Sequence, residues 1–413
     1  MRSTGASVQG DLLSGAAGLW MATVLHKVAV LGFSFCVGHG LGAEGVGVMA
    51  SVLAISWMVS TLAGWGLPDR ATFLGAAGDQ GDASRRSHGT FILMVMIAHG
   101  SLLLGVEHLA GVEKSEFVSF SIGLIVGAAG HSISAVGFSW LRGAGHPRME
   151  IVSTTVAAVS LLGGALVSVP LGMAWAISGL IMTGGAVLAG GLKPALPAFS
   201  DVGHYFRSGS RFLVFGLGAW VLGNIDILMA RILYAAEFVG DLQVGTMAVR
   251  GLALAPWLAA TFMLRPSREA WMKGVRPHPW RWSGGGVFVG VLVAGIAWIA
   301  TPFLARGHAM PVASIEDVAW MSMVMAPAFY AMVILLPLAA QWHMNRTLRA
   351  IGMGLIVQVG VGWAAADSIA VSSLVVVAGL GQLVTLMWLI QTLGSTSQQC
   401  FEMDRSTFIP GED

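Results

Sequence analysis

The chain has 413 residues, of which 55% are hydrophobic and only 10% are charged, and its mean hydropathy is +0.77. A water-soluble surface cannot be built from this composition, so it excludes a soluble globular protein and predicts one whose solvent is a lipid bilayer. A net charge of +1 argues against nucleic acid as a partner. The two cysteines, Cys36 and Cys400, provide no disulfide framework, so stability must come from helix packing.

Apolar stretches long enough to cross a membrane recur along the whole chain. A bilayer core requires about 20 apolar residues per helix. We place twelve spans at 12–37, 45–67, 90–110, 117–141, 149–169, 171–191, 211–233, 238–264, 284–305, 318–340, 350–367 and 369–392. The first stretch contains Lys27 and leads into a second apolar segment, so we interpret it as a retained helix rather than a cleaved signal peptide.

The basic residues between these spans predict how the chain is oriented. Fifteen Lys and Arg residues lie in connections that follow even-numbered spans, whereas only Lys114 and Arg306 follow odd-numbered ones. Basic residues are retained on the cytoplasmic side of a membrane. Both termini are therefore predicted to be cytoplasmic, in a multi-pass protein of the bacterial inner membrane.

A short motif repeats about halfway along the chain. AEGVG at residues 43–47 is echoed by AEFVG at residues 236–240, an offset of 193 residues. In each half we place the motif in the external turn between the first and second spans. This predicts two six-helix units in parallel orientation, an arrangement found in several secondary transporters.

Three segments resemble the polysaccharide and lipid-linked oligosaccharide flippases, the Wzx-like members of the superfamily (MOP) that also holds MATE exporters and MurJ-type flippases. The first joins GLGAEGVGVMASVLAISW at 40–57 to GWGLPDRATFLG at 64–75. The second is FSWLRGAGHPRMEI at 138–151, and the third, at 211–256, is similar to the family's seventh and eighth helices with an in-membrane aspartate. The family's usual tyrosine after the Val-Gly pair is replaced here by Asp241.

The resemblance implies both a fold and a function. It implies an all-α membrane protein of about 12 transmembrane helices in two six-helix lobes around a central cavity. The lobes would comprise residues 1–200 and 201–393, followed by a polar cytoplasmic tail at 394–413. The implied function is moving polyprenyl-diphosphate-linked oligosaccharide across the inner membrane for cell-surface polysaccharide synthesis. Membrane lipids, glycosyltransferases and a polysaccharide polymerase would be its partners.

Three ionisable residues within the spans indicate where an anionic substrate would bind. Ionisable groups inside a membrane are costly and usually face an aqueous or substrate-filled interior. With about 1.5 Å of rise per residue, Lys27, Asp226 and Arg250 all lie roughly 21 to 23 Å from the cytoplasmic edge. Lys and Arg replace phosphate hydration effectively, so we expect Lys27 and Arg250 to receive a diphosphate. A structural ion pair between Asp226 and Arg250 is the open alternative.

Other polar residues receive secondary assignments. Asn224 is a candidate substrate contact or a helix-helix hydrogen-bonding residue. Arg231 and Asp241 flank the external turn between the seventh and eighth spans, where a rim salt bridge or a gating contact would suit them. His26 and His131 are candidates for proton coupling, since histidine changes charge near neutral pH.

Competing functions differ in the residues that they require. No lysine follows a glycine as in a P-loop, so we expect neither ATP hydrolysis by this chain nor any cofactor. A MATE-like drug or metabolite antiporter is the main alternative, but cationic cargo would favour acidic cavity residues. A membrane enzyme of polysaccharide assembly is the third candidate, although the external connections are too short for its usual catalytic loop. We expect a transporter and not an enzyme.

Overall fold

The computed structural model describes residues 4–67, 82–106, 115–143, 148–167, 169–190, 199–253, short pieces between 256 and 267, 278–364 and 370–394. These residues form helices and no strands, which confirms the all-α fold class. The helices are α1 (Thr4–Gly64), α3 (Asp82–Leu104), α5 (Ser115–Gly143), α6 (Arg148–Leu166), α7 (Leu171–Leu188), α8 (Phe199–Leu233), α9 (Ala236–Gly251), α11 (Pro279–Gly307), α12 (Val312–Ala364) and α13 (Val371–Gly394).

Two of these helices contain a break that divides them into two spans. In α1 the break is at Gly42, whose φ of 68° and ψ of −169° are non-helical, a backbone conformation that only glycine adopts without strain. In α12 the break is at His343, with φ −144° and ψ 61°. Dividing both helices there gives twelve segments within the described residues, one for each predicted span. Eight helices are long and apolar enough to cross a membrane.

The boundaries differ from the predicted ones in specific places. We expected a short external turn at residues 38–44, but the chain stays helical on both sides of Gly42. The motifs at 43–47 and 236–240 therefore form the first turns of helical segments rather than the turns between them. Within the predicted span 238–264, α9 ends at Gly251 and residues 252 and 253 form a turn, while the described residues between 256 and 264 are again helical. The tail beyond residue 394 lies outside the described residues.

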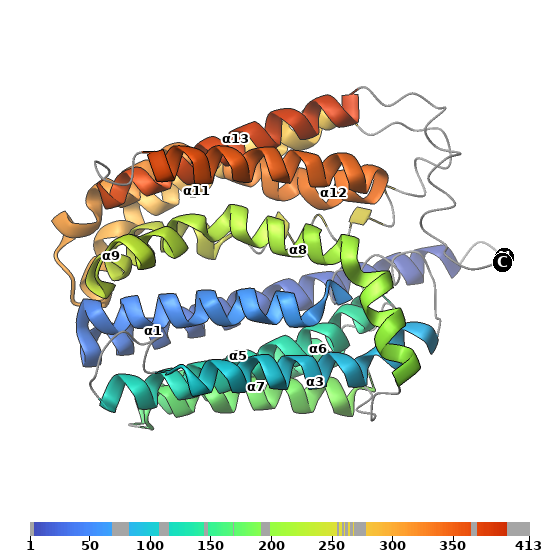
Figure 1. The fold of residues 1–413 in the computed structure, drawn as a ribbon, viewed down its shortest axis with the longest axis horizontal. Coiled ribbons are helices and arrows are strands. Elements are labelled where there is room, and N and C mark those ends of the chain that lie inside the picture. The colour runs from blue at the N-terminus through green and yellow to red at the C-terminus, as the bar shows by residue number, and fades with distance from the viewer. Residues whose placement is uncertain are drawn as a thin grey trace.

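The helices run roughly side by side along the long axis of the molecule (Figure 1). In the first half of the chain, α5 packs along α7 and α6 packs against both α1 and α7; in the second half, α12 packs against α11, α13, α8 and α9. Across the halves, α1 contacts α8 and α9. Figure 1 shows α8 between the helices of the first half and α11, α12 and α13.

The repeated motifs pack directly on one another where α1 meets α9. A Cβ atom added to Gly47 would lie 1.7 Å from the carbonyl oxygen of Ala236, and one added to Gly240 would lie 2.3 Å from the carbonyl oxygen of Ala43. Because residues 236 and 240 are 193 positions after 43 and 47, the contact is reciprocal, as expected for two repeats related by a two-fold axis. The repeat therefore marks a backbone-to-backbone contact between the halves at the end predicted to be external.

We predict that a methyl group at this contact separates the two halves at that end. In Gly47→Ala the new Cβ meets backbone, which cannot rotate away as a side chain would, so α1 and α9 must move apart. The measurement is the distance between spin labels at His39→Cys and Phe238→Cys in a background with Cys36→Ser and Cys400→Ser, and the distance distribution should shift to longer values. Gly163→Ala, at a position with no atom within 4 Å of the added Cβ, is the control. Equal distances in the two variants would contradict the role of the contact.

Candidate functional site

A buried salt bridge joins α8 to α9. Arg250 Nη2 donates to Asp226 Oδ2 in a salt bridge. The other carboxylate oxygen, Oδ1, accepts a hydrogen bond at 2.9 Å from the backbone N–H of the next residue, Ile227. The Asp226 side chain is completely buried and the Arg250 side chain is 19% exposed. The structural ion pair that the sequence left open is therefore present, and Arg250 is not a free cation.

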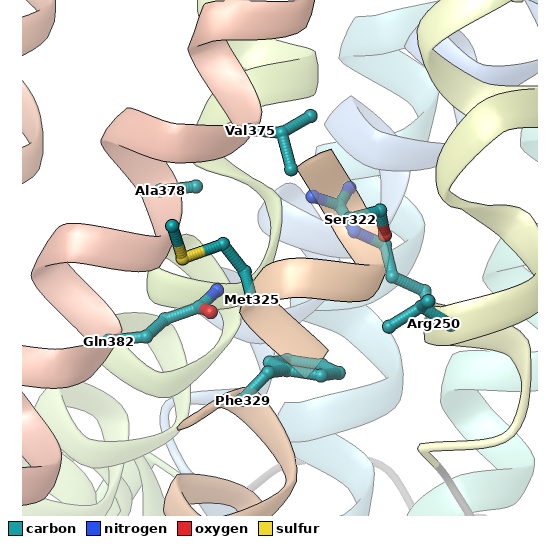
Figure 2. Close-up of a pocket in the computed structure, with 8 residues that line it drawn as sticks. Arg250, Ser322, Met325, Phe329, Val375, Ala378 and Gln382 are labelled. Carbon is teal, nitrogen blue, oxygen red and sulfur yellow. The ribbon is translucent and has the colours of Figure 1, made fainter. Parts of the chain in front are cut away.

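Arg250 also keeps one donor unused. Its Nη1 atom is buried and has no hydrogen-bond partner in the described part of the chain. A buried donor without a partner costs about 1–3 kcal/mol, and more when the group is charged. The guanidinium group lines a pocket together with Ser322, Met325 and Phe329 of α12 and with Gln382 of α13 (Figure 2). This arginine thus connects a carboxylate on one side to an open space on the other.

Lys27 lies on the other half of the molecule with its side chain exposed. It precedes Ser34 by seven residues and Gly38 by eleven, spacings that place all three on one face of α1. Ser34 Oγ approaches Met247 Sδ of α9 at 4.0 Å, so this face is turned toward the second half of the chain. Lys27 has no salt bridge to any described residue. Arg250 and Lys27 do not contact one another, and each sits on its own half.

Two histidines form a buried cluster beside Lys27. The His26 and His131 ring centroids are 5.5 Å apart, and His131 is also 5.5 Å from the Trp175 ring of α7. His131 Nε2 is 3.5 Å from Ser178 Oγ, while His26 Nδ1 is buried without a partner in the described residues. The two candidates for proton coupling are therefore neighbours, which the sequence could not indicate.

The remaining predicted site residues lie elsewhere. Asn224 Nδ2 donates to the Trp220 carbonyl at 2.9 Å within its own helix, and two residues along a helix turn it about 200° away from Asp226. Asp241 Oδ1 accepts a hydrogen bond from Ser314 Oγ at 3.1 Å, which ties the start of α9 to α12. Substrate binding by Asn224 and gating by Arg231 and Asp241 stay predictions.

A second contact between the halves is built around His308, just after α11. His308 Nε2 lies 3.0 Å from Ser34 Oγ, and Nδ1 lies 2.8 Å from the Leu304 carbonyl. Gly38 faces the His308 backbone so closely that an added Cβ would be 2.7 Å away. Burial lowers the pKa of His308, more than the Leu304 hydrogen bond raises it, and so favours the neutral ring. In that form Nδ1–H donates to Leu304 and Nε2 accepts from Ser34.

Two uncharged polar residues of the last two spans, Gln358 and Gln382, were not among the predicted site residues. Gln358 Nε2 donates to the carbonyls of Leu222 at 3.2 Å and Ala378 at 2.7 Å, and Gln382 Nε2 donates to Leu222 at 3.1 Å. The only signal available was the presence of an amide in each apolar stretch. Both amides join α8 to α12 and α13 at the level of the pocket.

The chain is similar in fold to solved transporters, although no family model and no curated protein matches its sequence. One is an inward-facing multidrug resistance MATE family transporter of the MOP superfamily, with a TM-score of 0.62, 11% identity and coverage of 95% of this chain and 99% of that one. The eukaryotic MATE transporter AtDTX14 matches with a TM-score of 0.64 and 14% identity, covering 97% of this chain and 100% of its own. The Vibrio cholerae MATE transporter VcmN in the bent form matches with a TM-score of 0.61 and 12% identity, covering 97% and 100%.

These matches, which extend over nearly the whole chain, define a membrane transporter fold. The architecture is that of the MATE transporters of the MOP superfamily, whose helices are arranged in two lobes. The chain is a multi-pass membrane protein with this fold. The fold that the resemblance implied is confirmed, and at these identities the likeness extends to the fold alone.

We predict that Asp226→Asn and Arg250→Gln each destabilise the protein more than the double variant does. Removing one partner leaves the other charge buried without compensation, which costs about 3–5 kcal/mol, whereas removing both leaves two neutral polar groups. Thermal unfolding in detergent measures this, and the double-variant cycle should give a favourable coupling energy. Asp241→Asn, which removes a more exposed carboxylate, is the control and should change stability little. If the double variant is destabilised by the sum of the two single-variant effects, the two residues are not energetically coupled, which would contradict this prediction.

Proposed function

We propose that this transporter is a flippase that moves a polyprenyl-diphosphate-linked oligosaccharide across the bacterial inner membrane for cell-surface polysaccharide synthesis. The observation that carries the proposal is Lys27, a cation on the face of α1 turned toward the second half, with no salt bridge from a described residue. An unneutralised cation in a membrane interior favours an anionic ligand. Diphosphate is the anion that lipid-linked sugars carry, and lysine is a common phosphate-binding residue.

Arg250 supplies a second positive group under this proposal. Its Nη2 is held by Asp226, while Nη1 is buried without a partner among the described residues; a phosphate oxygen that reached Nη1 would gain a hydrogen bond without displacing the carboxylate. Lys27 and Arg250 belong to different halves, so a diphosphate that contacts both would draw the halves together. Binding would thereby bias the equilibrium between conformations, as alternating access requires.

The external contacts suit the same cycle. The glycine pair Gly47 and Gly240, together with Ser34 and His308, holds the halves together at the end predicted to be external. Lys27 lies on the predicted cytoplasmic side of Ser34, and its exposed side chain is on the face of α1 that is turned toward the second half. Such an arrangement would admit a substrate from the cytoplasmic side, where glycosyltransferases build it, and release it outside to a polymerase.

A MATE-like antiporter of cationic compounds is the second candidate, because the solved structures with this fold include a multidrug transporter. In this chain Asp226, a buried carboxylate on α8, is already neutralised by Arg250 on α9. A cationic drug would have to replace that arginine. We therefore favour the anionic substrate.

We predict that Lys27→Ala slows translocation of a fluorescent polyprenyl-diphosphate sugar at least tenfold in reconstituted vesicles. The reason is the loss of one charge-assisted hydrogen bond, worth about 1.5–3 kcal/mol. Lys27→Arg should retain most of the rate, because it keeps the charge. Headgroup crossing is measured by protection from a membrane-impermeant quencher.

Arg306→Gln, which removes an exposed cation at the end of α11, is the matched control and should transport normally. Equal rates for wild type and Lys27→Ala would overturn the proposed site. Rapid transport of a cationic dye with no movement of the diphosphate lipid would favour the antiporter instead.

We further propose that His26 and His131 couple transport to a proton gradient. The two rings, whose centroids are 5.5 Å apart, cannot both be charged beside Lys27 without strong repulsion. A bound anionic substrate would offset that positive charge, so substrate binding and protonation of the two histidines would be linked.

We predict that His131→Gln transports the probe at the same rate with or without an imposed pH gradient, whereas the rate of the wild type depends on the gradient. His99→Gln is the control, since His99 is hydrogen-bonded to Ser60 and Val95 in a separate cluster. A gradient response retained in His131→Gln would contradict the assignment.

A further inference from the structure

An apolar core shared by the two halves closes the end of the molecule that is predicted to be external. One buried cluster contains Phe33 and Val37 of α1, from the first half, together with Leu304 of α11 and Met310, from the second. His308 lies in the same region and is fully buried, with an exposed fraction of 0%. Opening this end would require the halves to separate here, so the surroundings of His308 would change from apolar protein to water.

The turn that ends α11 fixes the position of the His308 ring. Met310 donates its N–H to the Ala305 carbonyl at 2.9 Å, and Ala309 before it has a φ of 56°, in the left-handed region that commonly ends helices. The Phe35 ring of α1 meets the His308 ring in a T-shaped arrangement, with centroids 4.8 Å apart and planes at 82°. One side of the environment of this ring is therefore supplied by the other half of the chain.

Hydrogen bonding alone does not decide which protonation state the closed contact prefers. Ser34 Oγ lies 2.7 Å from the Leu31 carbonyl and 3.0 Å from His308 Nε2. A neutral ring can accept the Ser34 proton at Nε2, whereas a charged ring would donate from Nε2 to Ser34, which could then donate to Leu31. Both forms keep a hydrogen bond between the halves. The difference between them is the charge, which apolar surroundings disfavour.

The charged neighbours of His308 add to this effect. Burial lowers the pKa of His308, the hydrogen bond to the Leu304 carbonyl raises it by less, and repulsion from His39 of α1 lowers it further. Arg306, on the same helix, is exposed, and Lys27 and Arg250 lie further along α1 and α9. The carboxylates at this end of α1, α9 and α12 are Glu44, Glu237, Asp241, Glu316 and Asp317. Asp241 is bonded to Ser314, and Glu237, Glu316 and Asp317 are exposed, where water screens their charge.

We propose that His308 is a proton-binding site that controls the opening of this end: the neutral ring keeps the halves in contact, and protonation favours their separation. The inference goes beyond the proposed substrate, because any transporter with this fold that opens at this end would respond in the same way. It is also distinct from proton coupling by His26 and His131, which lie within the first half.

The direction of the pH dependence follows from linkage. A histidine that binds its proton more weakly in the closed state than in the open state stabilises the closed state fully above its open-state pKa. That stabilisation declines as the pH falls from the open-state pKa toward the closed-state pKa. In water the pKa of histidine is about 6.5, so the contact should be firm at neutral and higher pH and should weaken in acid.

The test measures the distance between spin labels at Leu104→Cys, at the end of α3, and Phe238→Cys, near the start of α9, in the full chain with Cys36→Ser and Cys400→Ser. When the pH is lowered from about 8 to about 5.5, the ratio of long to short distances should rise by about three- to tenfold, tenfold being close to the limit for one proton. His308→Gln, which keeps a donor and an acceptor but cannot become charged, should abolish this response. His308→Asn is a second variant with the same expectation.

Three matched histidine variants serve as controls. His39→Gln removes an exposed neighbour, His131→Gln removes a histidine of the first-half pair, and His99→Gln removes one bonded to Ser60 and Val95. Each should still open in acid. An unchanged wild-type distance distribution between the two pH values, or a shift toward short distances in acid, would overturn the inference without any variant. A response that persists in both His308 variants, or that disappears in His131→Gln, would assign the proton to another group and overturn it as well.

Failure of this inference and failure of the proposed function are distinguishable. Wild-type protein that opens in acid but does not move a polyprenyl-diphosphate sugar would leave the proton-binding site standing and overturn the flippase. Protein that moves the lipid with a distance distribution independent of pH would do the reverse.

Discussion

The buried salt bridge between Asp226 and Arg250 constrains how the helices of the second half of the molecule can pack. A charged group away from water is tolerated only when it is paired and hydrogen-bonded. Asp226 meets both conditions through Arg250 and the Ile227 N–H, so α8 and α9 are fixed relative to one another. Arg250 meets them only in part. An arginine with one unpaired donor contributes less to stability than a fully paired one, and Arg250 is also one of the residues that line a pocket.

The contact between the halves has a different physical character. It depends on the absence of side chains, since Gly47 and Gly240 allow two backbones to touch, as small residues do in membrane helix packing. Such a contact is held by packing and by the Ser34–His308 hydrogen bond rather than by charge. It can therefore separate at low cost, whereas the Asp226–Arg250 pair cannot. Rigid pairing within one half and weak contact between halves are what a rocking mechanism requires.

The sequence predicted those features that depend on composition and spacing. Apolar length gave the number of spans, and the shared depth of Asp226 and Arg250 anticipated their contact. Depth says nothing about direction around a helix, so it could not show whether the Lys27 and Arg250 side chains contact one another. It also could not find the link from Gln358 and Gln382 to Leu222, which joins residues 136 and 160 positions apart. Uncharged amides in apolar spans carry no periodic signal, and the Gly42 break resembles an ordinary turn in the sequence.

Under the proposed function, the distribution of charge bears on the sign of the substrate's charge. In a symmetric carrier each half would hold similar charged groups, but here one half presents an unpaired lysine and the other an arginine whose charge is balanced by an aspartate. The net charge of the three groups is positive, and a low-dielectric interior strengthens its field. A diphosphate that contacts Lys27 and Arg250 Nη1 would neutralise this excess and give Arg250 Nη1 a partner, which it lacks among the described residues. A cation would add to the excess, and it would find its only nearby carboxylate among these groups already occupied.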